Sequence, residues 1–271
     1  MITSTLENKT EQVRSILLDL DRVAVAFSGG VDSSLLLALS VDVLGRDQVL
    51  AFTADSPLLT ERDRSNAQAV ASKLGVTVRF LPFDELTISA VASNAPDRCY
   101  HCKRARFEAL ITLAQAAGAQ LVHGENTDDS LDYRPGLAAS RELGVRAPLA
   151  EAGLNKAEVR QIAHRMGLPN WEQPSDACLA TRFPTNTRLT VEGLTRVQGA
   201  ENALRRLLGS VQVRLRDHGT LARLEVSPAV ITDLGQDPLR SAIVQELKAL
   251  GYRYVTLDLE GYRTGSTNER P

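Results

Sequence analysis

Val23-Ala-Val-Ala-Phe-Ser-Gly-Gly-Val-Asp-Ser-Ser34 is the stretch of this sequence that decides the fold. Its apolar start predicts a strand, which runs into a Ser28-Gly29-Gly30 turn and then directly into a helix over residues 35–44. Two glycines allow a tight turn and a close backbone approach to a ligand, and the N–H groups at a helix start attract anions. The stretch therefore predicts a loop that binds a chain of phosphates.

Residues 31–33 lack the lysine of the common Walker loop, which would read Gly-Lys-Ser or Gly-Lys-Thr here. Ordinary transfer of a γ-phosphoryl group is therefore not expected. A purely structural explanation of the stretch is a helix cap made by Ser28 or Asp32. The matching string Ser28-Gly-Gly-Val-Asp-Ser33, set between a strand and a helix, favours the nucleotide loop instead.

This string resembles the signature of the PP-loop ATP pyrophosphatase superfamily, whose members cleave ATP between the α and β phosphates. The resemblance implies that an adenylated substrate and pyrophosphate are formed, with Asp32 as a catalytic residue. It also implies that ATP is contacted by the loop residues Ser28, Gly29, Gly30, Val31 and Ser33.

The composition excludes several classes of protein. The 271 residues are 43% hydrophobic and 24% charged, as in a soluble globular protein of one large or two ordinary domains. A net charge of −2 and a pI near 6.1 give no overall attraction to nucleic acid. No apolar stretch reaches membrane-spanning length, and the start of the chain lacks the pattern of a secretory signal. We therefore expect a cytoplasmic protein without membrane contact, whose cysteines are reduced.

Apolar runs alternate with helical patterns from residue 23 onward, an order that predicts an α/β fold with a parallel sheet. We expect a strand from residue 23, further strands at 49–53, 76–81 and 121–124, and helices at 6–20, 61–74, 104–117 and 155–166. After residue 188 the pattern changes to a helix at 191–208, strands at 211–216 and 221–226, a helix at 239–250 and a strand at 252–258. We therefore expect a PP-loop ATP pyrophosphatase domain over residues 1–184 and a smaller C-terminal α+β domain over residues 185–271.

Polar residues follow several of the predicted strands. The loop at 28–33, Thr53 and the segment Gly124-Glu-Asn-Thr-Asp-Asp129 all fall at strand ends, where open parallel sheets bind nucleotides. Carboxylate oxygens suit a magnesium ion that also holds phosphates, so Asp32, Asp128 and Asp129 are candidate ligands. The superfamily has a similar Gly-X-Asn-X-Asp-Asp element after its fourth strand. Turn formation is the alternative role for Asp128 and Asp129.

The three cysteines, Cys99, Cys102 and Cys178, allow several interpretations. Cys99-Tyr-His-Cys102 begins a helix after the turn at 96–98, and all three thiols could simply pack. Zinc would need a fourth ligand, for which His101 is awkwardly placed within a helix. A redox pair of Cys99 and Cys102, with Cys178 as a persulfide carrier, is another possibility. A 4Fe–4S cluster held by three thiolates would leave one iron open, which suits sulfur transfer.

Four blocks together resemble the LarE family, the ATP-dependent sulfur transferases of nickel-pincer cofactor biosynthesis. They are Ser28-Gly-Gly-Val-Asp-Ser33, Arg98-Cys-Tyr-His-Cys-Lys103, Ser175-Asp-Ala-Cys-Leu-Ala-Thr-Arg182 and Leu257-Asp-Leu-Glu-Gly-Tyr-Arg-Thr-Gly265. The likeness spans nearly the whole chain. It implies that the substrate is a small molecule, pyridinium-3,5-biscarboxylic acid mononucleotide, whose carboxylates are adenylated and converted to thiocarboxylates. It also implies a homo-oligomer, with a hexamer as one candidate.

The family resemblance also bears on the source of sulfur. In one branch of the family, a cysteine matching Cys178 gives up its own sulfur and becomes dehydroalanine. This sequence has Cys99 and Cys102 in addition, which is similar to the three-cysteine branch and implies a 4Fe–4S cluster. Sulfide held there, or the Cys178 sulfur itself, would attack the acyl-adenylate and expel AMP.

The substrate phosphate needs a receptor, and arginine forks match phosphate oxygens. The candidates are Arg182, Arg214 and Arg263, which lie in the loop and strands that could close over the site, and Lys103 by resemblance. A surface ion pair is the alternative for each arginine.

Three rival functions are open to the sequence. A transfer-RNA thiolase shares the ATP loop and cysteine pairs, but it would need a basic landing surface that the acidic pI does not favour. A synthetase that uses ammonia has no need for three cysteines. A non-catalytic nucleotide sensor would bind ATP and release no pyrophosphate with any acceptor.

Overall fold

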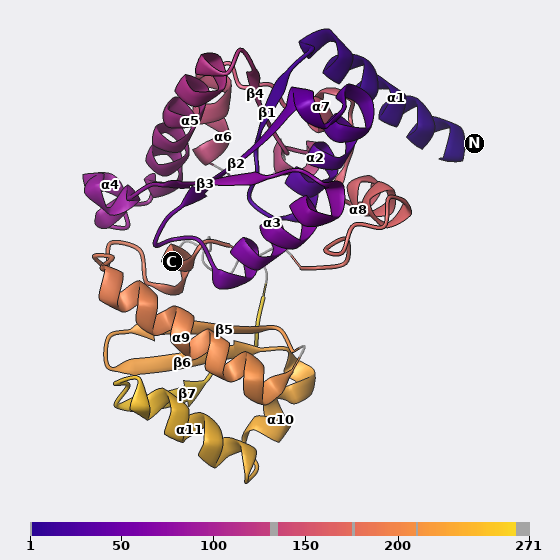
Figure 1. Cartoon of the computed structure of the whole chain (residues 1–271). Helices are drawn as coiled ribbons and strands as arrows, with labels where there is room; N and C mark the ends of the chain where they lie inside the picture. Colours follow the sequence, from indigo (N-terminus) through magenta and orange to yellow (C-terminus); the bar gives the residue numbers. More distant parts are fainter. Residues whose placement is uncertain (1, 131–134, 175–176, 210, 264–271) are drawn as a thin grey trace. The chain divides into compact units, whose positions relative to one another are not determined.

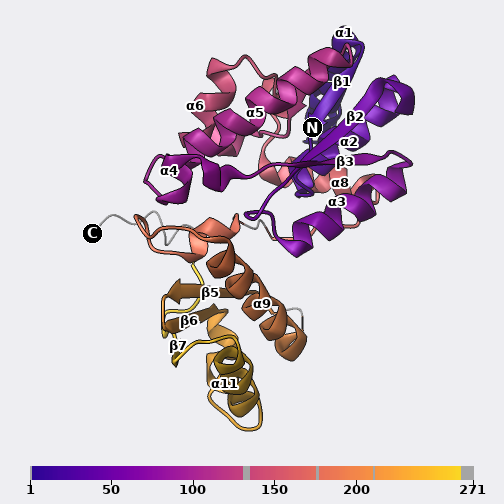
Figure 2. The ribbon, with the colours of Figure 1, turned by 60° about the vertical axis from the view of Figure 1, so that its left-hand side comes forward.

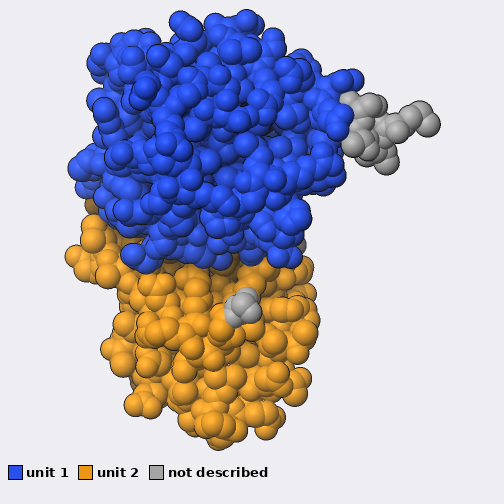
Figure 3. All heavy atoms as spheres, turned by 45° about the vertical axis from the view of Figure 1, so that its right-hand side comes forward, with its two compact units in different colours: residues 1–91, 97–176 blue, residues 92–96, 177–271 orange. Residues whose placement is uncertain are grey.

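The chain folds into two compact units (Figure 3). The computed structural model describes residues 2–130, 135–174, 177–209 and 211–263. Unit 1 consists of residues 1–91 and 97–176, and unit 2 consists of residues 92–96 and 177–271. Ser175 and Asp176 of the Cys178 block, and Thr264 and Gly265 of the C-terminal block, lie outside the described residues.

Unit 1 is built on a four-stranded parallel sheet (Figure 1). Its strands are β1 (Val23–Ala26), β2 (Val49–Asp55), β3 (Val78–Pro82) and β4 (Gln120–His123), in the order β3-β2-β1-β4. The chain moves outward from β1 through β2 to β3 and then returns to the other side of β1, so the strand order switches between β1 and β4. The expected α/β fold is confirmed, and its nucleotide crevice is expected at this switch point.

Helices cover both faces of the sheet (Figure 2). They are α1 (Ile2–Leu20), α2 (Val31–Leu44), α3 (Glu61–Leu74), α4 (Ser89–Ala92), α5 (Arg98–Ala116), α6 (Pro135–Glu142), α7 (Pro148–Glu151) and α8 (Lys156–Arg165). Side chains alternate across a strand, so Val23 and Val25 of β1 join the core under α1, α2, α3 and α8. Ala24 instead joins the core under α5. Within the described part of the chain, none of the helices combines the length and apolar character needed to cross a membrane.

Unit 2 has a small mixed sheet in the order β5-β6-β7. Strands β5 (Val213–His218) and β6 (Leu221–Val226) are antiparallel, and β7 (Tyr254–Leu257) pairs parallel to β6. Helix α9 (Val191–Leu208) packs on β5 and on α11 (Leu239–Ala249), and the short α10 (Ile231–Leu234) precedes α11. The expected α+β character of the C-terminal part therefore agrees with the observed sheet and helices.

The division between the units falls after residue 176, earlier than the expected boundary at 184/185. Residues 92–96, which belong to unit 2 although unit 1 precedes and follows them, explain part of the difference. The buried amide of Asn94 donates to the carbonyl oxygens of Phe183 (3.3 Å) and Pro184 (2.8 Å), and Asn186 N donates to Asn94 O at 2.9 Å. These bonds join residues about ninety positions apart, which a local sequence pattern does not reveal.

Gly29 offers a test of how tightly the β1–α2 turn is packed. Gly29 and Gly45 both have φ of +79°, but a Cβ on Gly29 would lie 2.4 Å from Asp63 O, whereas a Cβ on Gly45 meets nothing within 4 Å. We expect Gly29→Ala to destabilise unit 1 by roughly 2 kcal/mol more than Gly45→Ala, because backbone must move to relieve the overlap. Urea unfolding followed by fluorescence of Trp171, the one tryptophan, measures the difference. Equal midpoints for the two variants would contradict the close packing.

Candidate active site

The turn after β1 is stabilised by hydrogen bonds of the Ser28 and Ser33 hydroxyl groups. Ser28 N donates to Ser33 Oγ at 3.3 Å, Gly30 N donates to Ser28 Oγ at 3.3 Å, and Ser33 Oγ donates to Gly30 O at 3.0 Å. Helix α2 begins at Val31, and its N-cap Gly30 has no side chain to occupy the first N–H groups. These N–H groups have no partner within the helix, and with the helix dipole they form an anion site.

Two neighbouring segments press on this turn. The amide nitrogen of Asn170, which is 2% exposed, donates to Gly29 O (2.8 Å) and to Ser34 Oγ (2.9 Å). A Cβ on Gly124, directly after β4, would lie 2.6 Å from Ser33 N, so only glycine permits this approach of β4 to α2. Thr53, expected to contact the nucleotide, is buried and donates its hydroxyl to Phe27 O at 2.6 Å. Its hydroxyl therefore ties β2 to the end of β1.

Asn126 connects two of the expected metal-binding carboxylates. Its Nδ2 donates to Asp32 Oδ1 at 3.0 Å and to Asp129 Oδ2 at 3.1 Å, and its backbone N also donates to Asp129 Oδ2 at 3.1 Å. Asp128 N donates to the Asn126 Oδ1 atom at 3.0 Å. The structure thus brings the loop at 28–33 and the segment after β4 to one edge of the sheet, as the sequence predicts.

Lys156 is a site residue that sequence reasoning missed. Its ammonium group pairs with Asp32 Oδ2, and its backbone N donates to Asp128 Oδ2 at 3.0 Å. The side chain is held at the first position of α8, where Asn155 and Glu158 form a capping box. The capping pattern Asn-x-x-Glu is readable from sequence, but it predicts only the helix start and not the contact with Asp32.

Magnesium would bind here through few protein ligands. Carboxylate oxygens of Asp32, Asp128 and Asp129 are the hard donors that Mg²⁺ prefers, and Asp32 already faces a cation in Lys156. In the described part of the chain, however, no three acidic, histidine or cysteine side chains converge on a single metal position. This donor set fits an ion that keeps several waters and takes the rest of its ligands from phosphates.

None of the three cysteines forms a disulfide, and they belong to different units. Cys99 and Cys102 lie in the first two turns of α5, three positions apart and so on one helix face. Arg98 Nη2 lies 3.6 Å from the Cys99 sulfur. His101, considered as a zinc ligand, instead contacts Asp97 Oδ2 through Nε2 at 3.0 Å. Cys178 lies in unit 2.

Buried arginines hold the turn that carries Cys178. Arg182 is 0% exposed and donates from Nη1 to Ala177 O at 2.6 Å and to Thr181 Oγ1 at 3.1 Å. Its Nε and Nη2 donate to the two carboxylate oxygens of Glu201 at 2.8 and 3.1 Å. Arg216 Nη1 donates to Thr181 O at 2.7 Å. Arg182 therefore positions the Cys178 turn. Its contact with the substrate phosphate stays a prediction.

The other expected phosphate receptors differ in their surroundings. Arg214 is 2% exposed, donates to Val213 O at 3.0 Å and lies 5.2 Å from the centre of the Tyr262 ring. Arg263 donates to Glu260 Oε2 at 2.8 Å, and its side chain is about half exposed. Lys103 on α5 lies 5.1 Å above the Phe107 ring. Arg263 and Lys103 thus keep access to solvent, whereas Arg214 is enclosed.

Comparisons with known proteins agree with this geometry. The model of a protein family described as NAD synthase matches residues 10–190 of this chain. The pyridinium-3,5-bisthiocarboxylic acid mononucleotide synthase of Lactiplantibacillus plantarum is 40% identical over 98% of this chain and 96% of its own length. An uncharacterized protein of Synechocystis sp. is 44% identical over 97% of this chain and 98% of its own length. The NH3-dependent NAD+ synthetase of Hyperthermus butylicus is 32% identical over 54% of each chain.

The first strand of the parallel sheet leads through a glycine turn into α2, and carboxylates lie at the same edge of the sheet. With the family match, these features define an ATP-dependent α/β enzyme of the PP-loop superfamily. Membership of this superfamily implies ATP and Mg²⁺ as ligands. The chain belongs to the family of the pyridinium-3,5-bisthiocarboxylic acid mononucleotide synthase, the LarE family, as its sequence blocks predict.

Lys156 is expected to strengthen ATP binding. Lys156→Met removes a cation from the mouth of the phosphate site and leaves Asp32 uncompensated, so both changes disfavour a polyanion. We expect the Kd of MgATP, measured by titration calorimetry, to rise about tenfold or more. Lys248→Met, which removes the same charge from α11 in unit 2, is the control. An unchanged Kd in Lys156→Met would exclude a role for this lysine in binding phosphate.

Glu201 is expected to control the accessibility of Cys178. Arg182 pairs with both carboxylate oxygens of Glu201, and Glu201→Gln removes the negative charge of that pair. Arg182 is then held less firmly, and so is the Cys178 turn that it supports. In chains with Cys99→Ser and Cys102→Ser, where Cys178 is the one remaining thiol, we expect alkylation by iodoacetamide to become several times faster. Glu192→Gln, in the first turn of the same helix, serves as the matched variant. Identical alkylation rates would argue against the anchoring role.

Proposed function

We propose that this chain adenylates the carboxylates of pyridinium-3,5-biscarboxylic acid mononucleotide with ATP and converts them to thiocarboxylates. The main structural support for this proposal is the Asn126 amide, which donates hydrogen bonds both to Asp32 of the glycine loop and to Asp129 after β4. The near full-length similarity to a synthase named for the bisthiocarboxylic product supports the choice of substrate.

The first step activates the acceptor. A carboxylate oxygen of the acceptor attacks the α-phosphorus of ATP, and the bond from that phosphorus to the bridging oxygen of pyrophosphate breaks. The N–H groups at the start of α2 and the Lys156 ammonium are the donors placed to bind the negative charge of the departing pyrophosphate. Asp32, Asp128 and Asp129 would hold Mg²⁺, which when bound neutralises phosphate charge.

The second step delivers sulfur. A thiolate sulfur attacks the acyl carbon, and AMP leaves with the electron pair of the broken C–O bond. If the sulfur is that of Cys178, the thioester then loses its Cβ–S bond and the Cα proton, which yields the thiocarboxylate and dehydroalanine. Arg182 and Arg216 hold the turn on which this sulfur stands.

Cys99, Cys102 and Cys178 would together hold a 4Fe–4S cluster, as in the three-cysteine branch of the family. None of the three forms a disulfide, and Cys99 and Cys102 share one face at the start of α5, which fits thiolate ligation. Such a cluster, when bound, supplies an iron without a protein ligand at which sulfide binds. We also propose a reducing, cytoplasmic setting, which keeps these thiols free, and a homo-oligomeric assembly, with a hexamer as one candidate.

The proposal is tested by following both products in the purified protein. We expect pyrophosphate release to require the acceptor, to be abolished in Asp32→Ala, and to persist in Cys178→Ala without formation of thiocarboxylate. Pyrophosphate release without any acceptor dependence, or thiocarboxylate formed by Cys178→Ala, would contradict the proposal. Retention of bulk transfer RNA at low salt would favour the thiolase alternative, and ATP binding without turnover would favour a nucleotide sensor.

Anaerobic purification separates the two sulfur sources. About four iron atoms per chain, with acid-labile sulfide, are expected for the cluster, and each cysteine-to-serine change should lower that content. Iron-free protein that loses about 34 Da at Cys178 after turnover would instead show that the cysteine is consumed.

A further inference from the structure

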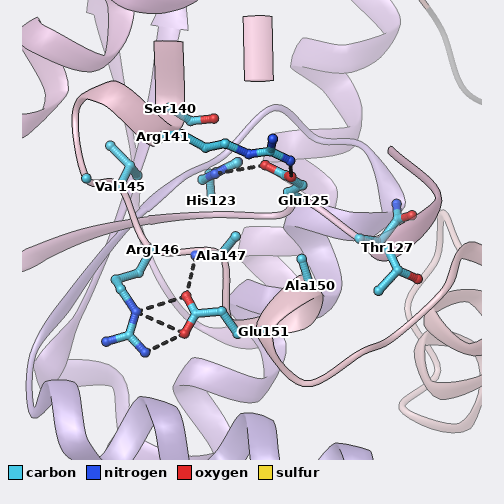
Figure 4. Close-up of a pocket in the computed structure, with 12 residues that line it drawn as sticks. His123, Glu125, Thr127, Ser140, Arg141, Val145, Arg146, Ala147, Ala150 and Glu151 are labelled. Atoms are coloured by element: carbon cyan, nitrogen blue, oxygen red, sulfur yellow. Dashed lines mark hydrogen bonds and ion pairs between the residues drawn. The ribbon is translucent and has the colours of Figure 1, made fainter. Parts of the chain in front are cut away.

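Unit 1 contains a pocket at the outer side of β4 (Figure 4). Its volume is about 510 Å³, within the range of small-ligand sites. The wall is formed by the end of β4 and the segment after it, by α6, and by the segment through α7. Asn126, which contacts Asp32 and Asp129 of the nucleotide site, also lines the pocket. The pocket therefore shares Asn126 with the candidate nucleotide site.

Glu125 places a buried carboxylate in the pocket wall. The residue is 8% exposed, and its two oxygens lie 3.5 Å from His123 Nε2 and 3.7 Å from Arg141 Nη2. Both distances exceed those of short hydrogen bonds, which are about 2.7 to 3.2 Å. A buried carboxylate with such long contacts is available to a ligand that carries positive charge or hydrogen-bond donors.

His123 does not neutralise this carboxylate. Burial, together with the nearby charge of Lys103, lowers the pKa of His123 to about 3, so its imidazole is uncharged at neutral pH. Its ring also packs edge-on against Phe107 at 5.3 Å between centroids. Among the described residues, the positive group paired with Glu125 is therefore Arg141, whose side chain is 66% exposed and strongly solvated.

The opposite wall offers no second acidic acceptor. Glu151 accepts hydrogen bonds from Arg146 Nε at 2.9 Å to each oxygen and from Ala147 N at 2.9 Å (Figure 4). The Arg146 guanidinium lowers the pKa of Glu151, which keeps that carboxylate charged and paired. Among the described residues that line this pocket, Glu125 thus remains the acidic group whose contacts are long.

We infer that this pocket binds the cationic pyridinium ring of the acceptor, with the Glu125 carboxylate facing the ring charge and Arg141 at the rim facing a ring carboxylate. The inference rests on the proposed function and deepens it. Adenosine carries no positive charge, and the anion site for its phosphates lies at the start of α2. Charge complementarity therefore favours the acceptor over ATP, although the ribose hydroxyls of either nucleotide could also donate to a carboxylate.

A pair of isosteric probes tests the charge directly. N-methylpyridinium-3,5-dicarboxylate and 5-methylisophthalate have the same methyl group and the same two ring carboxylates, but only the first has a positive ring. We expect the wild-type protein to bind the cationic ring about tenfold more tightly than the neutral ring, and Glu125→Gln to lose that preference. Glu11→Gln, an exposed carboxylate on α1, should keep it. Thermal unfolding of Glu125→Gln checks that the variant is folded.

Three results would overturn the inference. The first is an equal affinity of the wild-type protein for both probes, and the second is a preference for the cationic probe that survives in Glu125→Gln. The third is a loss of affinity for MgATP in Glu125→Gln as large as the loss for the cationic probe, which would assign the pocket to the ribose of ATP. Pyrophosphate release remains a separate measurement. Wild-type protein that prefers the cationic probe but never releases pyrophosphate with an acceptor would contradict the proposed function and leave the pocket assignment standing.

Discussion

The side-chain amide of Asn126 is the constraint on which the site depends. It joins Asp32, Asp128 and Asp129 through hydrogen bonds of 3.0 to 3.1 Å, and it is almost fully buried. Gly124 precedes it because a side chain there would overlap the backbone of α2. The amide donates to the carboxylates of Asp32 and Asp129, and the Lys156 ammonium pairs with Asp32, so both groups offset negative charge at this edge of the sheet.

The Cys178 turn is organised by a different device. Arg182 and Glu201 form an ion pair that is 0% and 1% exposed, and such buried pairs add little net stability because both charges lose water. Their benefit here is geometric, since the remaining Arg182 donor and Arg216 fix backbone carbonyls beside the cysteine. The turn is further held by the burial of Leu179 and Ala180 directly after the cysteine.

Elements with local start and stop signals were predicted closely. Helix α3 has the predicted bounds, with Thr60 capping its start and Gly75 in the left-handed conformation at its end. Helix α9 and strand β6 also have the predicted bounds, whereas α6 was not predicted, since it spans only eight residues and has Gly136 in its first turn. The sequence does not predict that residues 92–96 belong to unit 2, because Asn94 forms its hydrogen bonds with a distant segment.

The sequence by itself determined the strand, the glycine turn and the helix that follows it, because those properties follow from residue type and short-range periodicity. It also indicated Asp32, Asp128 and the cysteines as candidate site residues by their chemistry. Only the tertiary structure decided that Lys156 pairs with Asp32, 124 positions earlier, and that Arg182 faces Glu201 inside unit 2. Partners of long charged side chains are set by how distant segments pack, and no local preference of the chain encodes that arrangement.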